Sequence, residues 1–467
     1  MTHRNFGSNF NHLFSIEEIR LLPHIKRYIE CAMGDSEFKS RIANHNRDFE
    51  GFLKSRGIIG VELAQMNVLL SEIANLKPLM QWDVEDKPQV KLWQNWVLEM
   101  HDYRERWKQL SDESMNEDFN YWRMRQKNRC HNQLSKGTND SLIHATVAFE
   151  LSSGCSMQCS FCGLESKPLD KVFRYNKANQ KMWRAVLEVV YKHLGASMAF
   201  GACYWGTEPT DNPDYHEFLL DFKRITGLLP QTTTAAPLRN FNWTATLLKN
   251  RTQCLTAVDR FSILTEETLR RVHETFSSEA LAHTELILQY TDLKKQTMAS
   301  SGRNRNQMMS REMKDHTIAC VTGYIINMTD GMVKLVSPCP PSETNPLGYI
   351  VFDECKFKSA PQLDLFFKNT MAMMHPKKIG PTHVITLMEG ISIKSIKNGF
   401  ELHSEYKTYK FYGKPHLESF GYCLNDGRMT MSEIIDSIFE ESIEILDILS
   451  IIQSLSDYCL IKDENIF

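Results

Sequence analysis

Three cysteines in one short segment have the residue type and spacing to bind a metal centre. Cys155, Cys159 and Cys162 lie in GCSMQCSFCG with the spacing C-x3-C-x2-C, whereas the other cysteines of the chain are isolated. Thiolates are soft ligands that suit iron–sulfur clusters, while structural zinc sites usually close their shell with four ligands. We therefore predict a [4Fe–4S] cluster with one iron left open. The alternatives are a structural zinc site and buried free thiols.

A strand–loop–helix pattern positions these cysteines. Residues 145–151 read as a strand, the cysteine loop follows directly, and the next segment, QKMWRAVLEVVYKHLG, has the apolar spacing of a helix. Strands and helices alternate through residue 291, with SMAFGACYW expected as the second strand. Repeated units of this size predict a parallel sheet, open or closed into a barrel, whose chemistry lies at the carboxyl ends of its strands. The cysteine loop should therefore lie at the functional face.

The chain divides into four predicted regions. Residues 1–138 show helical periodicity and are expected to cap the central α/β region, 139–316. Residues 317–382 should begin with a hairpin that turns at Asp330-Gly331 and should complete the site. Residues 383–467 combine strand-like segments with helices, which indicates a winged-helix-like module.

Composition and charge narrow the class of protein. The formal net charge is −3 and 24% of residues are charged, so a basic surface for nucleic acid is not expected. No apolar stretch approaches the roughly 18 residues that suggest a membrane span, and the start lacks the apolar core of a signal peptide. We expect a cytoplasmic protein with no membrane partner, in which the cysteines stay reduced.

The cysteine segment resembles the CxxxCxΦC signature of the radical S-adenosylmethionine (SAM) superfamily, with Phe161 as the aromatic residue. This resemblance implies a partial (βα)6 barrel in which SAM binds the open iron. An electron from a flavodoxin or ferredoxin would pass through the cluster and cleave SAM into methionine and a 5′-deoxyadenosyl radical.

Further positions resemble the SAM contacts of that superfamily. Gly206-Thr207-Glu208-Pro209 is similar to the GGEP motif, although the first glycine is replaced by Trp205 or shifted. Ser262 and Arg303 resemble its polar ribose and carboxylate contacts. The resemblance therefore implies SAM-binding roles for Phe161, Gly206, Thr207, Glu208, Pro209, Ser262 and Arg303.

The resemblance also narrows the reaction. CYWGTEPTDNPDYHEFLLDF, PQTTTAAP and SPCPPSETNPLGYIVFDE, within 140–360, are similar to the proteusin-type epimerases that convert L-residues to D-residues in ribosomally made precursor peptides. The C-terminal unit is similar to a PqqD-like recognition element, which captures a leader peptide as an added strand. The alternatives are another radical SAM maturase, which crosslinks or excises backbone, and a catalytically silent peptide-binding partner.

Epimerisation needs a hydrogen donor on the second face of Cα, and a thiol is suitable because its S–H bond is weak. We rank Cys339 first, Cys320 second and Cys355 third. A two-residue turn at Asp330-Gly331 would set Thr322 opposite Cys339, with Cys320 diagonally beside it at the open end of the hairpin.

Two other uses of these cysteines stay open. Each is alternatively a packed core residue. The hairpin cysteines also loosely match half of an auxiliary-cluster domain, but Cys355, Cys423 and Cys459 lack tight spacing, which favours a single cluster.

Overall fold

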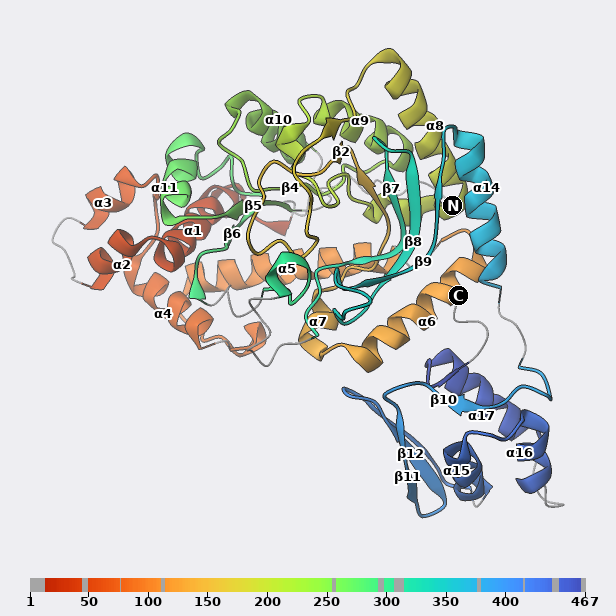
Figure 1. Ribbon diagram of the computed structural model, residues 1–467. Helices are drawn as coiled ribbons and strands as arrows, with labels where there is room; N and C mark the ends of the chain where they lie inside the picture. The colour runs from red at the N-terminus through yellow and green to blue at the C-terminus, as the bar shows by residue number, and fades with distance from the viewer. Residues whose placement is uncertain are drawn as a thin grey trace.

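The computed structural model describes most of the chain. The described residues are 13–43, 49–75, 77–110, 114–253, 258–292, 298–305, 315–375, 379–414, 416–438 and 445–462. They form a mixed α/β protein with open sheets (Figure 1). No helix among them combines the length and apolarity needed to cross a membrane.

The described part of the N-terminal region, up to residue 141, consists of helices joined by loops. A capping box between Ser15 and Glu18 starts the first helix, with the Ser15 Oγ accepting from the Glu18 N–H at 3.2 Å. Apolar faces of these helices meet in a core of their own. The helices are α1 Ile16–Gly34, α2 Ser36–Ala43, α3 Phe49–Ser55, α4 Leu63–Ala74, α5 Pro88–Leu110, α6 Glu117–Gln133 and α7 Lys136–Ser141, with a short 3-10 turn, η2, at Leu79–Gln81.

The central region consists of strand–helix units whose strands run parallel. One parallel sheet has the order β4-β5-β6, and β1 belongs to a second sheet. The strands are β1 Ala145–Glu150, β4 Thr233–Thr234, β5 Asp259–Ile263 and β6 Thr284–Leu288, and the helices are α8 Lys177–Leu194, α9 Tyr215–Thr226, α10 Phe241–Gln253 and α11 Glu266–Thr275.

The prediction that SMAFGACYW forms the second strand is wrong for most of that segment. The segment forms a 3-10 helix, η3 Gly195–Phe200, and only Ala202 makes a parallel bridge, to Ala148 of β1. Short apolar runs do not distinguish buried helix from strand. Here Gly195, at φ +58, ends α8, and the Ser197 carbonyl then accepts from the Thr146 hydroxyl at 2.9 Å. The chain therefore keeps a helical turn before it reaches the sheet.

The second sheet has the order β1-β7-β8-β9 and joins the central region to residues after 317. Strand β7 pairs in parallel with β1, and β8 and β9 follow antiparallel. The bounds are β7 Val321–Asn327, β8 Met332–Pro338 and β9 Tyr349–Lys356, and α14 Ala360–Met373 follows.

The predicted hairpin exists, but its register differs from the expected one. Asn327 pairs with Met332, so four residues turn the chain instead of two. The Asn327 Oδ1 accepts from the Thr329 hydroxyl at 2.6 Å and from the Asp330 N–H at 2.9 Å, an Asx turn that lengthens the loop. Gly323 pairs with Val336, and Cys320 and Cys339 lie just outside the two strands, which begin at Val321 and end at Pro338. The prediction that Thr322 faces Cys339 is therefore wrong.

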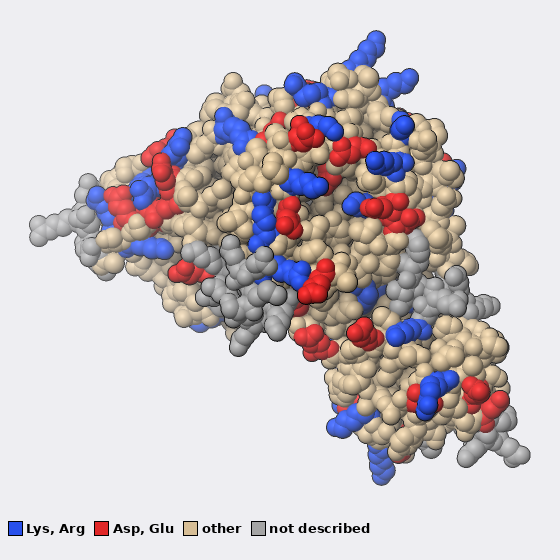
Figure 2. Space-filling model, in the orientation of Figure 1, with Lys and Arg blue, Asp and Glu red and all other residues tan. Residues whose placement is uncertain are grey.

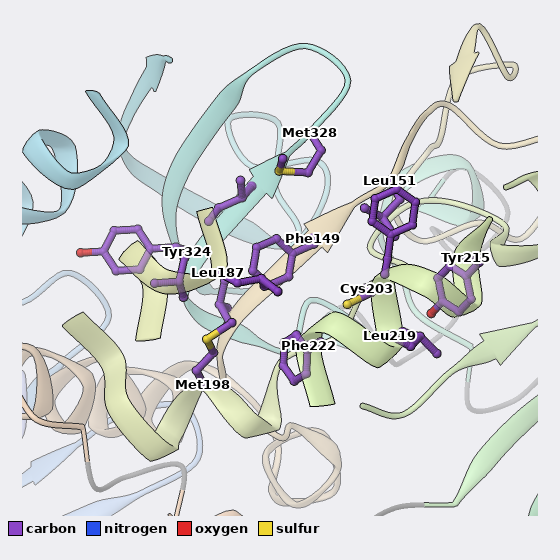
Figure 3. Close-up of a cluster of buried hydrophobic side chains, with 14 of the residues drawn as sticks. Phe149, Leu151, Leu187, Met198, Cys203, Tyr215, Leu219, Phe222, Tyr324 and Met328 are labelled. Carbon is purple, nitrogen blue, oxygen red and sulfur yellow. The ribbon is translucent and has the colours of Figure 1, made fainter. Parts of the chain in front are cut away.

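The main core lies on one face of this sheet. Phe149 of β1 and Tyr324 of β7 pack with Leu187 of α8 and Phe222 of α9 (Figure 3). The opposite face carries a smaller apolar cluster, which we call the inner cluster: Ala145, Ala148, Trp205, Ala319, Val321, Ile325 and Val336, with Leu164, Cys320 and Tyr349 packed against it. Because Leu164 belongs to the cysteine loop, that loop covers the inner face.

The C-terminal unit has its own core and lies below the main body in Figure 1. The Thr430–Glu433 capping box is confirmed, since the Glu433 N–H donates to the Thr430 Oγ1 at 3.2 Å. The elements are β10 Thr386–Leu387 paired with β14 Ile461–Lys462, the sheet β11 Ser392–Ile396, β12 Gly399–His403 and β13 Thr408–Tyr412, and the helices α15 His416–Asp426, α16 Met431–Ile438 and α17 Ile445–Asp457.

Candidate functional site

The cysteine loop follows directly after β1. Strand β2, Ser152–Ser153, pairs with β3, Lys171–Val172, and closes the loop at its base. The Cys155 N–H donates to the Lys167 carbonyl at 2.9 Å. Gly154 has φ +83, and a Cβ there would lie 2.2 Å from the Pro168 carbonyl oxygen. Only glycine therefore allows the loop to close this tightly before the first cysteine.

The three loop cysteines are free thiols, each half-buried. Burial raises the pKa of Cys155 to about 11 and also raises that of Cys159. Burial acts in the same direction on Cys162, but hydrogen bonds from the Ser166 backbone and the Arg303 side chain outweigh it and lower the pKa of that thiol. Among the described residues, no three His, Cys, Asp or Glu side chains are grouped closely enough to hold one metal ion.

The Cys162 end of the loop is held by residues 301–303. The Ser301 hydroxyl donates to the Gly163 carbonyl at 2.9 Å, and the Arg303 N–H donates to the Cys162 carbonyl at 3.0 Å. Gly302, at φ +57, packs so closely that a Cβ would lie 2.5 Å from the Cys162 carbonyl oxygen. This contact joins the loop to the segment that follows β6.

The Arg303 guanidinium donates two hydrogen bonds to residues of the cysteine loop. It donates to the Gln158 Oε1 at 2.8 Å and to the Ser166 carbonyl at 3.1 Å. The contacts that the structure describes are therefore to the loop itself, which makes Arg303 a support of the Cys162 end.

Two residues that the sequence reasoning missed hold the Cys155 end. The Asp211 carboxylate accepts from the Ser156 N–H at 2.9 Å and from the Ser156 hydroxyl at 2.5 Å. The Arg239 guanidinium pairs with Asp211 at 2.5 Å and donates to the Ser156 Oγ at 2.8 Å. Asp211 follows Pro209 closely in sequence, but nothing in the sequence pattern connects Arg239 to the loop.

The Gly206–Pro209 segment lies between the loop and β4. Glu208 is buried, and its Oε1 accepts from the Thr210 N–H and hydroxyl, each at 3.0 Å, and from the Thr234 hydroxyl. Its Oε2 accepts from the Ala235 N–H at 2.8 Å. Burial raises the pKa of this carboxyl although these donors lower it. Pro209 begins a short 3-10 turn, η4 Pro209–Asp211.

The remaining predicted SAM contacts are more loosely connected. Phe161, before the last loop cysteine, is half-buried. The Thr207 N–H donates to the Tyr204 carbonyl at 3.2 Å. Ser262, on β5, accepts from the Gln289 amide at 3.4 Å. Of the predicted set, the structure therefore brings Arg303 into direct contact with the loop.

Gly206 is the point where the loop approaches β1. It has φ +61, and a Cβ there would lie 3.7 Å from the Ser166 Oγ and 3.4 Å from the Glu150 Oε1. The Ser166 Oγ is itself 3.8 Å from the Cys162 Sγ. The thiol, the serine hydroxyl, the glycine and the Glu150 carboxyl therefore share one neighbourhood.

Cys320 lies on the side of the sheet that the loop covers. It is half-buried and packs against the inner cluster, as does Leu164 of the loop, and also against Cys130, Leu134 and Leu142. A Cβ at Gly163 would lie 2.9 Å from the Ile318 side chain, two residues before Cys320. The Cys162 end of the loop therefore packs against the segment that leads into Cys320.

Cys339, in contrast, is buried at 4% exposure. Burial raises its pKa to about 12, and the charged or titratable neighbours that act on it are Arg129 and Cys130 of α6. Cys355 lies on β9 opposite Val333 and packs against the main core. Of the three donor candidates, Cys320 is the one with both partial exposure and proximity to the loop.

Helix α6 connects this region to the C-terminal unit. Arg129 donates to the Pro338 carbonyl at 2.7 Å and to the Ser337 Oγ at 3.0 Å, beside Cys339. On the same helix, the Asn132 amide donates to the Tyr458 carbonyl at 2.9 Å and accepts from the Tyr409 hydroxyl at 2.7 Å. The helix thus contacts both the cysteine-bearing hairpin and the C-terminal module.

Comparison with known proteins assigns a family to this mixed α/β protein with its clamped three-thiol loop. Over 459 residues, 96% of this chain and 88% of the relative, it is 30% identical to the uncharacterized protein y4wI of Sinorhizobium fredii (strain NBRC 101917 / NGR234). The chain belongs to the same family as y4wI. No family model and no solved structure matches it.

Proposed function

We propose that this protein is a radical SAM peptide epimerase that converts L-residues to D-residues in a ribosomally made precursor peptide. The observation that carries the proposal is the loop with Cys155, Cys159 and Cys162, which presents three free, half-buried thiols and is clamped at both ends. The segments within 140–360 that are similar to proteusin-type epimerases supply the reaction class.

The residues present fit a [4Fe–4S] cluster. Each thiol would hold a different iron, so the three need not converge on one ion. The lowered pKa of Cys162 favours the thiolate that binds metal. With SAM bound, such a cluster would supply a carbon radical able to take a hydrogen atom from a peptide Cα. A flavodoxin or ferredoxin is the proposed electron donor.

The proposed SAM site lies beside the loop and includes Gly206-Thr207-Glu208-Pro209, Phe161, Ser262 and Arg303. In the described contacts the Glu208 Oε2 accepts one N–H, which leaves it capacity to accept from an ammonium group. Arg303 keeps the loop in place through Gln158 and Ser166. The parallel units would form part of the partial (βα)6 barrel of the superfamily.

Cys320 is the proposed hydrogen donor, because a donor thiol must reach the peptide. The partial exposure of Cys320 and its packing near Leu164 favour it over the buried Cys339, which the sequence ranked first. Cys339 would instead support the hairpin beneath α6.

The C-terminal unit is the proposed leader-peptide module. Its sheet has the order β11-β12-β13, so β11 and β13 each keep an edge that is unpaired within that sheet. Main-chain hydrogen bonds from an added strand would give affinity, and neighbouring side chains would give selectivity. A leader bound there would hold the core peptide near the barrel.

Two experiments test the proposal. Anaerobic reconstitution with iron and sulfide should yield a SAM-cleaving protein that forms 5′-deoxyadenosine with dithionite, and triple replacement of the loop cysteines by alanine should abolish this. Co-expression in D2O with short peptides encoded beside the gene should add about one dalton per inverted residue. A mass change in ordinary water would indicate crosslinking or excision, and absence of 5′-deoxyadenosine would indicate a silent binding partner.

A further inference from the structure

Glu150 ends β1 immediately before the cysteine loop and turns its carboxyl toward the loop side of the sheet. Its Oε1 lies against Gly206, since a Cβ on that glycine would be only 3.4 Å away. The same Cβ would be 3.7 Å from the Ser166 Oγ, which in turn is 3.8 Å from the Cys162 Sγ. A carboxyl group is thus held beside the proposed cofactor site.

Asn327 fixes the orientation of this carboxyl. The Asn327 Nδ2 donates to the Glu150 Oε2 at 2.6 Å. The amide of Asn327 cannot rotate freely, because its Oδ1 already accepts from the Thr329 hydroxyl and the Asp330 N–H. Oε2 is therefore committed to Asn327, and Oε1 is the oxygen turned toward Gly206.

The surroundings of Glu150 combine aromatic rings with two opposite charges of the hairpin, Lys334 and Asp330. Trp205 and Tyr349 lie edge to face near it, with ring centroids 6.3 Å apart, and both belong to the inner cluster. Burial raises the pKa of Tyr349 to about 12, and the nearby Glu150 carboxylate acts in the same direction, so the Tyr349 ring is neutral. An acceptor oxygen beside aromatic walls matches the N–H groups and small side chains of an extended peptide.

Glu208 is buried whereas Glu150 is half-buried, and the two carboxyls differ in their hydrogen bonding. Its two oxygens accept from Thr210, Thr234 and Ala235, which makes it part of the scaffold between η4 and β4. Glu150 has one described donor, on Oε2, and its second oxygen retains acceptor capacity.

We propose that Glu150 binds a backbone N–H group of the substrate peptide through Oε1 and so positions the residue to be inverted beside the cysteine loop. This inference rests on the proposed function, because it takes the ligand at this face to be a peptide. It assigns Glu150 to peptide binding and excludes it from SAM binding.

Glu150→Gln is a sharp test because of the fixed Asn327 amide. The glutamine oxygen must face the Asn327 Nδ2, so its NH2 group is turned toward the peptide and presents a donor where an acceptor is needed. The matched control is Glu188→Gln on the exposed face of α8, which makes the same chemical change away from the site.

The probe is an acetylated, amidated octapeptide of alternating alanine and serine, added to the full-length SAM-loaded protein. Calorimetric titration at pH 8, where the Glu150 carboxyl is ionised although burial raises its pKa to about 7, should show about tenfold weaker binding to Glu150→Gln than to wild type, with Glu188→Gln unchanged. Formation of 5′-deoxyadenosine from SAM alone should be equal in all three proteins.

Unchanged peptide affinity in Glu150→Gln, or no binding by wild type, would overturn the proposal. An equal fall in peptide-free SAM cleavage would also overturn it, because Glu150 would then belong to the SAM site. Failure of the proposed function is a separate result: the wild-type protein would put no deuterium into any co-expressed peptide, whatever the octapeptide titration shows.

Discussion

The backbone N–H of Arg303 donates a hydrogen bond of 3.0 Å to the carbonyl oxygen of Cys162. This bond joins the last cysteine of the loop to the segment that follows β6. Together with the Ser301–Gly163 hydrogen bond, it holds the Cys162 end of the loop in position. The geometry of the proposed cluster site therefore depends on residues far from the cysteines in sequence.

Gly302→Ala should disturb the loop more than an ordinary glycine substitution does. Gly302 has φ +57 and a Cβ would meet the Cys162 carbonyl at 2.5 Å, whereas Gly227 has φ +80 and no atom within 4 Å of its Cβ position. Gly302→Ala and the control Gly227→Ala should both carry left-handed backbone strain of about 1 to 3 kcal/mol. Only Gly302→Ala should also lose iron on reconstitution, as measured by iron content per chain. Equal iron content in the two variants would contradict the role of the Cys162–Arg303 contact.

Removing Asp259 should strongly destabilise the β4-β5-β6 sheet. Its carboxylate pairs with Arg251 at 2.8 Å, and the two side chains are 0% and 1% exposed. Because Asp259→Ala removes the counter-charge of a buried guanidinium and leaves it the neutral Leu229 and Pro230 carbonyls, we expect the free energy of unfolding to fall by about 3 to 5 kcal/mol. The control, Asp140→Ala, breaks the exposed Lys136–Asp140 pair and should change it by less than about 1 kcal/mol. Urea denaturation followed by circular dichroism measures both, and a similar small loss in each would refute the prediction.

The ionisation of Glu150 should lower the free energy of unfolding as the pH rises. Burial raises the pKa of this carboxyl from 4.5 to about 7. Between these values the folded state keeps the proton and the unfolded state has lost it, so the free energy of unfolding falls as pH rises across this window. Glu150→Gln cannot titrate, so its stability relative to wild type should improve by up to about 3 kcal/mol from pH 4 to pH 8. A pH-independent difference in urea unfolding between the two proteins would show that the carboxyl is not perturbed.

Cys320→Ala should stop deuterium transfer to the peptide while 5′-deoxyadenosine still forms, because Cys320 is the proposed donor and lies outside the cluster loop. Cys339→Ala should preserve deuterium transfer and chiefly lower stability by about 1 kcal/mol or more, since this thiol is buried. Mass spectrometry of peptide co-expressed in D2O, with a thermal melt of each variant, separates the two effects. Loss of transfer only in Cys339→Ala would restore the ranking that the sequence favoured.

Surface charge offers no counter-indication to a peptide substrate. Lys and Arg are interspersed with Asp and Glu over the face in Figure 2, without a continuous basic stripe on that face. This mixture accords with the formal net charge of −3.

Local sequence patterns predicted the elements that have strong signals of their own. The N-terminal helices, α8 and α9, and the Thr430–Glu433 capping box each depend on side chains within a few residues of one another. The prediction of a strand around Ala202 was wrong because an apolar run fits either a strand or a short helix. The prediction of a two-residue hairpin turn was wrong because the Asn327 side chain, not the Asp-Gly dipeptide, sets the loop length.

By itself, the sequence determined the spacing of Cys155, Cys159 and Cys162, and hence the thiol ligands available for a cluster. Only the tertiary structure decided how that loop is held and which other groups reach it. Asp211, Arg239 and Ser301 clamp the loop, Glu150 approaches it past Gly206, and Cys339 is buried. These relations join segments that are distant in the chain, so no local periodicity encodes them. They arise from the packing of the β1-β7-β8-β9 sheet against its helices on one face and the cysteine loop on the other.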